Sequence, residues 1–175
     1  MGECSINRDG ERIPISQSER ERKEKKYDYY GASGVIDQID GYTHNGDFLL
    51  IGEDGANLVT RSTPIAFIAR GQFWVNNHAH VLQYLNEVSL KRAEIYLNAI
   101  DLKPYITGGF QPKLNQANLN LVVFPFPPLA EQAAIVAKVE GLLGQVRALE
   151  TGATRQQALA GALMQAVLGE VLGAG

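Results

Sequence analysis

The chain has 175 residues, of which 45% are hydrophobic and 20% are charged, and its formal net charge is −3. This composition predicts a globular fold with a core, and no apolar run approaches the roughly 18 residues that a membrane span requires. The acidic balance also argues against a free-standing nucleic-acid-binding module, because such modules are usually basic.

The first residues and the cysteine content indicate a cytoplasmic protein. The N-terminal sequence MGECSINRDGERIP has no apolar stretch of the kind found in secretory signals. The single cysteine, Cys4, has no internal partner for a disulfide bond, which fits a reducing compartment.

Charged residues and tyrosines dominate the stretch SERERKEKKYDYYGASG, residues 18–34. The simplest interpretation is a solvated charged segment. The alternative is that this segment places cations, aromatic rings and a small-residue loop beside a phosphate backbone. The candidate residues for that contact are Lys25, Lys26, Tyr29, Tyr30 and Ser33.

Short apolar runs separated by Gly, Asn and Asp fill residues 27–126. These runs are typical of strands, and the breaks between them are typical of turns. The predicted strands are DFLLIG (47–52), PIAFIAR (64–70), QFWV (72–75), AHVLQYL (79–85) and LNLVVFPF (119–126).

One helix is predicted among these strands. Ser89 can cap it, and apolar residues then follow at helical spacing at positions 90, 93, 97 and 100. Since helices do not regularly separate the strands, the pattern indicates an α+β domain with a mixed or antiparallel sheet.

Three histidines raise the possibility of chemistry. His78 and His80 are two residues apart, a spacing that puts both rings on one face of a strand, and Glu53 and Asp54 could complete a metal site. The alternative is that these histidines are hydrogen-bonded parts of a sheet.

His44 and Asp47, in the sequence THNGDF, could form an acid–base pair. We favour a glycine-centred turn that enters the strand 48–51. No nucleophile elbow, phosphate-binding loop or dinucleotide-binding motif is present in the sequence.

The stretch YITGGFQPKLNQANL, residues 105–119, combines a glycine pair with a lysine and several amides. Gly108 and Gly109 permit positive φ or a close approach of the backbone to DNA. Lys113 can meet a phosphate, while Gln111 and Asn115 can pair with a base or bridge to the backbone. The alternative is internal scaffolding, in which the amides satisfy buried backbone groups.

The sequence changes character at residue 127. Pro128 suits the first position of a helix, and Glu131 would lie in its first turn. Apolar residues then recur at spacings of 4, 3, 4 and 3, which is the seam of a coiled coil. The seam residues, and the predicted dimerisation residues, are Ile135, Val139, Leu142, Val146 and Leu149.

The predicted organisation is therefore a globular domain over residues 1–126 and a helical region over residues 127–175. A continuous helix over 129–170 would extend roughly 60 Å, about twice the width expected for the domain, so its seam needs another helix. The alternative is a helical hairpin that folds back at Gly152.

Several of these segments, taken in order, resemble Type I restriction-modification specificity subunits, with one target-recognition domain followed by its helical spacer. The tail RQQALAGALMQAVLGEV also resembles the end of that spacer. The motifs that carry the resemblance are IPISQSERERKEKKYDYYGASGVID, FLLIGEDGANL, PIAFIARGQFWVNNHAHVL, PYITGGFQPKLNQANL and FPFPPLAEQAAIVAKVEGLL.

The resemblance implies a role without a catalytic centre. Such subunits read a split DNA sequence and dock methyltransferase subunits, which bind S-adenosylmethionine. In the full enzyme they also support an ATP-driven restriction subunit. No cofactor is therefore expected on this chain. The resemblance further implies that base choice resides in residues 27–47, 54–63 (which include Arg61) and 83–104, while the glycine loop positions the DNA.

The usual family member has two recognition domains and two spacers, and this chain has one of each. We therefore expect it to act as a homodimer.

Two other functions are compatible with the sequence. One is an antirestriction protein that competes for the methyltransferase subunit, although a DNA mimic would carry denser carboxylates than this chain. The other is a metal-dependent nuclease that uses His78, His80, Glu53 and Asp54.

Overall fold

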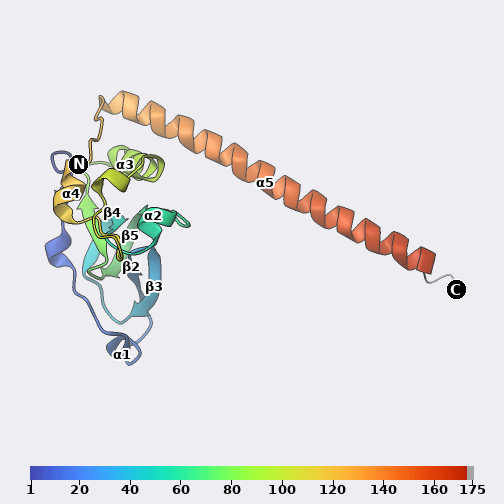
Figure 1. Cartoon of the computed structure of the whole chain (residues 1–175), viewed down its shortest axis with the longest axis horizontal. Coiled ribbons are helices and arrows are strands. Elements are labelled where there is room, and N and C mark those ends of the chain that lie inside the picture. Colours follow the sequence, from blue (N-terminus) through green and yellow to red (C-terminus); the bar gives the residue numbers. More distant parts are fainter. Residues whose placement is uncertain (173–175) are drawn as a thin grey trace. The chain divides into compact units, whose positions relative to one another are not determined.

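The computed structural model describes residues 1–172, which form two compact units (Figure 1). The first unit is Met1–Ala133, and the second begins at Ala134. The first unit holds a six-stranded mixed sheet in the order β1-β6-β4-β5-β2-β3. The strands are β1 (Ile6–Asn7), β2 (Tyr27–Gly31), β3 (Gly34–Ile39), β4 (His44–Gly52), β5 (Ala66–Val75) and β6 (Ala79–Gln83).

Four short helices and two 3₁₀ turns complete the first unit, and its N-terminus lies beside α4 (Figure 1). They are η1 (Asp9–Glu11), α1 (Gln17–Arg20), α2 (Asn57–Thr60), α3 (Glu87–Ala99), η2 (Lys103–Tyr105) and α4 (Gln116–Leu121). The predicted α+β class with a mixed sheet is confirmed: most strand pairs are antiparallel, and β2 runs parallel to β5.

The central strand β4 is buried on both faces over residues 48–52. Leu49 and Ile51 join the core that packs against α3, while Phe48 and Leu50 belong to a second core formed with β5 and β6. Successive side chains of a strand point to opposite faces, so a strand covered on both faces reads as an unbroken apolar run. This explains why FLLI was recognisable as a strand.

Helix α3 is confirmed, but its predicted cap is wrong. The side chain of Asn86, not Ser89, lies at the N-cap and accepts a hydrogen bond from the Ser89 amide at 2.9 Å. Leu90 and Leu97 face the core, as their spacing predicted. The Ser89 hydroxyl instead donates to the Gln132 side chain at 3.0 Å.

Residues 119–126 do not form the predicted strand. Asn115 caps α4 by accepting a hydrogen bond from the Asn118 amide, and Leu119 and Val122 are buried against the α3 side of the core. An irregular segment rich in proline follows, and proline cannot donate to a strand ladder. The apolar residues that suggested a strand therefore pack α4 and the residue that follows it against the core.

The turn expected at residues 44–47 is also absent, because β4 begins at His44. Gly46 is paired across the strands with Gly71, and both have positive φ, at 136° and 75°. This pair of glycines lets the long β4–β5 ladder continue through a backbone conformation that other residues rarely adopt.

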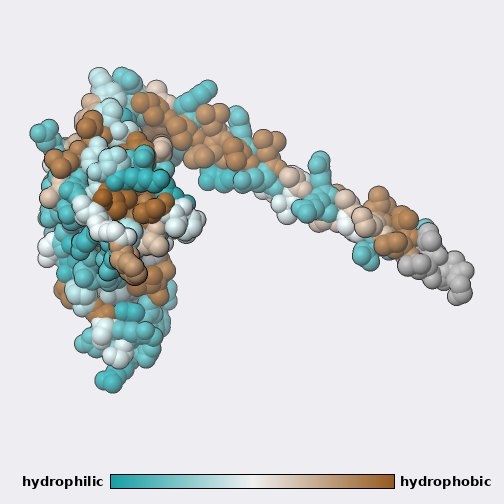
Figure 2. All heavy atoms as spheres, in the orientation of Figure 1, coloured by the Kyte–Doolittle hydropathy of each residue, from teal (hydrophilic) through white to brown (hydrophobic). Residues whose placement is uncertain are grey.

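Helix α5 (Leu129–Leu172) is continuous over 44 residues, so the hairpin at Gly152 does not form. Its length corresponds to about 66 Å at 1.5 Å per residue. Apolar side chains gather along its first half, give way to a polar stretch and return near its end (Figure 2). Among the helices of residues 1–172, none combines the length and apolar character needed to cross a membrane.

Replacing the α3 cap tests this account of the fold. We expect Asn86→Ala to lower the free energy of unfolding by about 1 kcal/mol, because the Ser89 amide loses its acceptor. Asn77→Ala, at an exposed position before β6, is the matched control and should change stability little. Urea unfolding followed by circular dichroism measures both, and equal stabilities for the two variants would contradict the assignment of the cap.

Candidate nucleic-acid interface

Four chain segments meet at one end of the sheet, and we call them the loop cluster. A Cβ added to Gly52 would lie 2.8 Å from the Ala32 carbonyl oxygen, so these two backbones are in direct contact. The Glu53 amide donates to the His78 carbonyl at 2.9 Å, and the Leu114 amide donates to the Glu53 carbonyl at 2.8 Å. The loop cluster consists of residues 31–34, 52–55, 76–78 and 107–114.

The glycine loop of this cluster is closed at its base and bent at its first glycine. Thr107 and Lys113 exchange two backbone hydrogen bonds of 2.8 and 2.7 Å. Gly108 has φ of +81°, and a Cβ there would lie 2.4 Å from the Gln111 carbonyl oxygen. Gly109 has open space around it. Of the two glycines, only Gly108 is therefore demanded by the geometry.

Lys113 sits at the edge of this loop with half of its side chain exposed, at 50%. Its ammonium lies 3.1 Å from a Glu53 carboxylate oxygen. Burial would raise the pKa of Glu53, but the Arg12 guanidinium at 2.7 Å, the nearby His80 ring and Lys113 together hold that pKa below its ordinary value. Lys113 is thus positioned by a carboxylate while one side of it faces solvent.

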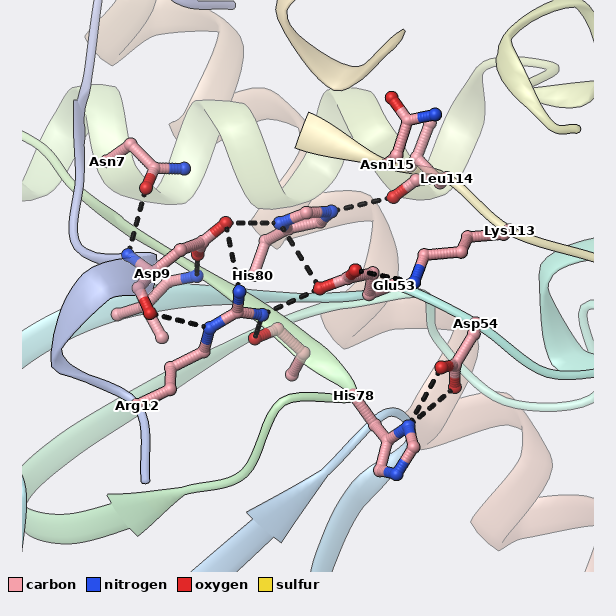
Figure 3. Close-up of polar contacts among 12 residues, drawn as sticks. Asn7, Asp9, Arg12, Glu53, Asp54, His78, His80, Lys113, Leu114 and Asn115 are labelled. Atoms are coloured by element: carbon pink, nitrogen blue, oxygen red, sulfur yellow. Dashed lines mark hydrogen bonds and ion pairs between the residues drawn. The ribbon is translucent and has the colours of Figure 1, made fainter. Parts of the chain in front are cut away.

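A buried polar network fixes the loop to the sheet (Figure 3). His80, which is fully buried, contacts a carboxylate oxygen of Asp9 through Nδ1 at 2.6 Å and the Leu114 carbonyl oxygen through Nε2 at 2.7 Å. These two contacts fix the orientation of the ring. Burial would raise the pKa of Asp9, but hydrogen bonds from His80 and from the Val81 amide lower it.

The metal site considered for His78 and His80 is not formed. Both nitrogens of His80 are occupied by protein acceptors, and His78 pairs instead with Asp54 at 2.8 Å on the surface. Throughout residues 1–172, no group of three or more His, Cys, Asp or Glu side chains is arranged to hold a metal ion. The alternative interpretation, that these histidines are hydrogen-bonded parts of the fold, describes His80.

The acid–base pair considered for His44 and Asp47 is not formed either. His44 is buried, its ring is stacked on Phe73, and Nδ1 lies 2.8 Å from the Thr43 hydroxyl. Burial lowers the pKa of His44. Asp47 binds Arg70 on the neighbouring strand.

The basic segment before β2 lies at the opposite end of the β2–β3 hairpin from the loop cluster. The Lys25 ammonium contacts Asp37 at 2.8 Å, and this hydrogen bond is the main reason why the pKa of Asp37 falls to about 2. Lys26 lies over the Tyr27 ring, 5.2 Å from its centroid. These lysines are therefore held against their own hairpin.

The two candidate tyrosines are largely internal. Tyr29 is 1% exposed, and its hydroxyl accepts a hydrogen bond from the Ile15 amide at 3.1 Å. Tyr30 is partly buried, with its ring stacked on Phe67 and edge-on to Phe73. Neither ring is presented to a ligand in this arrangement.

Two further candidates have local structural partners. Arg61 adopts a left-handed conformation and donates to the carbonyl oxygens of Asn98 and Ile100, at 2.9 and 2.6 Å, at the end of α3. Asn115 caps α4. The candidates that the loop cluster brings together are Ser33, Gly108, Gly109, Gln111 and Lys113; Ser33 and Gln111 are exposed.

Sequence reasoning missed Phe110 as a candidate, although it lies in the quoted glycine motif. Its side chain is fully exposed at the tip of the loop. The available signal was an aromatic residue directly after a glycine pair and outside any apolar pattern. It also missed Asp9 and Arg12, which carry no local motif and acquire their role only through contacts with Glu53 and His80.

Comparison with known proteins identifies the fold and the family of this arrangement. Residues 4–158 match the family model described as the Type I restriction modification DNA specificity domain. A putative type I restriction enzyme specificity subunit of Haemophilus influenzae is 38% identical over 115 residues, covering 65% of this chain and 29% of that protein. The EcoprrI specificity subunit of Escherichia coli is 29% identical over 153 residues, covering 83% and 36%.

Solved structures show the same fold. The Type I restriction-modification S subunit of M. genitalium aligns with 85% of this chain and 39% of its own, at 16% identity and a TM-score of 0.63. A chain from a structural study of complex assembly and conformational transition of the type I system aligns with 95% and 43%, at 20% identity and a TM-score of 0.69. The chain thus spans about a third of the length of the curated relatives it matches.

The buried network yields a prediction about stability. We expect Asp9→Asn to lower the free energy of unfolding by about 3 kcal/mol at pH 7, because one partner of a buried charge pair is lost. The folded-state pKa of Asp9 is lowered, so its contribution is complete above about pH 4 and is lost as the pH falls through the folded value.

Urea unfolding at pH 7 and pH 3 measures this effect, and the difference between wild type and Asp9→Asn should shrink at the lower pH. Asp101→Asn is the matched control, since Asp101 is exposed and an amide oxygen can still accept the hydrogen bond of the Lys103 amide. A variant at position 9 as stable as the wild type at pH 7 would show that the network is not needed.

Proposed function

Since the chain belongs to the Type I restriction modification DNA specificity domain family, we propose that it is the DNA sequence-recognition subunit of a Type I restriction-modification enzyme. In this proposal it binds half of a bipartite duplex site and docks a methyltransferase subunit. The supporting observation is the family match over residues 4–158, which covers the loop cluster and most of α5.

The loop cluster is the proposed place where the DNA backbone is positioned. Ser33, Gln111 and Lys113 are exposed there, and each can donate to a phosphate oxygen. Base choice is assigned to the neighbouring segments 27–47, 54–63 and 83–104. Tyr29 is left out of the proposed contacts because it lies in the core.

The chain is proposed to act without a catalytic centre of its own. Methyl transfer from S-adenosylmethionine and ATP-driven restriction would belong to the methyltransferase and restriction subunits. The competing antirestriction function gains no support from the carboxylates, because Asp9 and Glu53 are paired with Arg12, and Asp37 is paired with Lys25. A DNA mimic needs such groups unpaired and in an array.

Helix α5 is proposed to join two copies in an antiparallel, two-fold pair. Leu142, Val146 and Leu149 are exposed along the seam, and Ile135 and Val139 are half-buried. Pairing two such seams would remove this apolar surface from water and place one recognition unit at each end of the pair. Two half-length chains would then supply the two recognition units that a split site requires.

Binding to DNA by the chain alone should be weak and sensitive to salt, because the net charge of −3 gives no long-range attraction. Addition of the methyltransferase subunit should tighten it greatly. Fluorescence anisotropy with duplex DNA over a range of salt concentrations measures this effect. Nanomolar affinity of the chain alone in physiological salt would contradict the idea that the binding surface is shared.

Within that complex, Lys113→Ala should weaken binding about equally on all sequences and reduce the salt dependence by about one counterion. Arg155→Ala removes one positive charge from an exposed position on α5, outside the loop cluster and the base-choice segments, and serves as the control. An unchanged salt dependence for the first variant would remove Lys113 from the proposed backbone contacts.

The pairing of α5 makes a prediction about oligomeric state. Val139→Glu combined with Val146→Glu should give monomers, because like charges would face each other in the seam. Ala137→Glu combined with Ala148→Glu adds the same charge off the seam and should leave the dimer intact. Light scattering at roughly tens of micromolar distinguishes the two. A monomeric wild type at that concentration would refute the homodimer.

A further inference from the structure

Phe110 is held in water at the tip of the glycine loop, where it contributes nothing to the core. Its relative exposure is 108%, the highest among the exposed large hydrophobic side chains of residues 1–170. Burying a phenylalanine side chain typically stabilises a fold by about 1.5–3 kcal/mol, and this chain forgoes that gain. A single exposed apolar residue needs no explanation by itself, so the way in which the ring is presented decides its meaning.

The stem beneath Phe110 is built to hold the tip in place. The backbone hydrogen bonds between Thr107 and Lys113 close the loop, and the Pro112 carbonyl accepts a hydrogen bond from the Gly55 amide at 3.1 Å. Leu114, the residue after Lys113, is fully buried. The aromatic ring is therefore carried on a braced hairpin whose shape is set by Gly108.

Several other side chains of the loop cluster are polar. Lys113 and Glu53 form an ion pair, His78 and Asp54 form another, and the Gln111 amide is exposed. A protein-docking site buries several apolar side chains together, as an interface core requires. One aromatic ring within a rim of hydrogen-bonding groups instead suits a ligand with flat apolar faces and polar edges. Stacked nucleobases have this chemistry.

We infer that Phe110 is a wedge that stacks against an opened base step of the duplex, while Lys113 and Gln111 hold the adjacent backbone. The inference rests on the proposed function, since it requires DNA to lie over the loop cluster. Pyrimidine–purine steps unstack most readily, so the wedge would favour such a step where it enters. It would thus add sequence preference through the deformability of the DNA, without a hydrogen bond to a base edge.

Binding measurements in the complex with the methyltransferase subunit test the wedge, with a pool of 30-base-pair duplexes of random sequence as the probe. Phe110→Ala should weaken binding by about tenfold or more, whereas Phe110→Trp should stay within about threefold of wild type. The salt dependence should remain that of the wild type, because a stacking contact releases no counterion. A changed salt dependence, or wild-type affinity for Phe110→Ala, would overturn the wedge.

The two glycines provide a matched pair of variants in which Phe110 is retained. Gly108→Ala forces a Cβ onto the Gln111 carbonyl and should lose as much affinity as Phe110→Ala. Gly109→Ala meets open space and should bind like the wild type. Equal binding by both variants would show that the braced stem does not present the ring.

Photocrosslinking identifies what the ring touches. With p-benzoylphenylalanine at position 110 of the complex, crosslinks to the duplex pool are expected. The same probe at exposed Leu121, which lies outside the loop cluster and the base-choice segments, is the control. Crosslinks only to the methyltransferase subunit, or none, would overturn the inference and leave the proposed function intact. Failure of the wild-type complex to bind any duplex would overturn both.

Discussion

Compensation of buried charge beneath the glycine loop constrains the whole N-terminal unit. Asp9, Arg12, Glu53 and His80 have side chains no more than 15% exposed, and they come from the N-terminal segment, the residue that follows β4, and β6. An uncompensated buried charge is costly, so these segments must assemble together to be stable. The Leu114 carbonyl belongs to the same network, which makes the position of the loop a property of the core.

Local sequence patterns predicted several elements of the fold. The apolar residues of α3 and of α5 repeat at helical spacing, and the unbroken apolar run 48–51 is typical of a strand covered on both faces. The wrong predictions, a turn at Gly46 and a helix cap at Ser89, have a different origin. Gly46 belongs to a strand because Gly71 pairs with it across the sheet, and Asn86 displaces Ser89 as the cap because the chain enters α3 one turn earlier. The pairing of Gly46 with Gly71 depends on the register between two strands, which the spacing of residues within one strand does not predict.

The candidate site was less predictable than the fold, because one residue type can position a ligand or support the chain. Tyr29 follows a basic run that suggests DNA contact, yet its ring closes the core and is covered by Arg20 at 4.7 Å. Arg61 is a cation in a polar segment, yet it satisfies carbonyl groups at the end of α3. Only tertiary contacts separate these residues from Gln111 and Lys113, which remain open to solvent.

The exposed apolar seam of α5 also has a consequence for the abundance of this protein in a cell. A solitary copy exposes Leu142, Val146 and Leu149 together with a second apolar group that includes Leu163. Exposed apolar surface of this kind attracts chaperones and proteases and promotes aggregation. Chains whose α5 is paired with a partner helix would persist, while unpaired chains would be degraded. The abundance of the protein would then depend on the supply of partner helices as well as on its rate of synthesis.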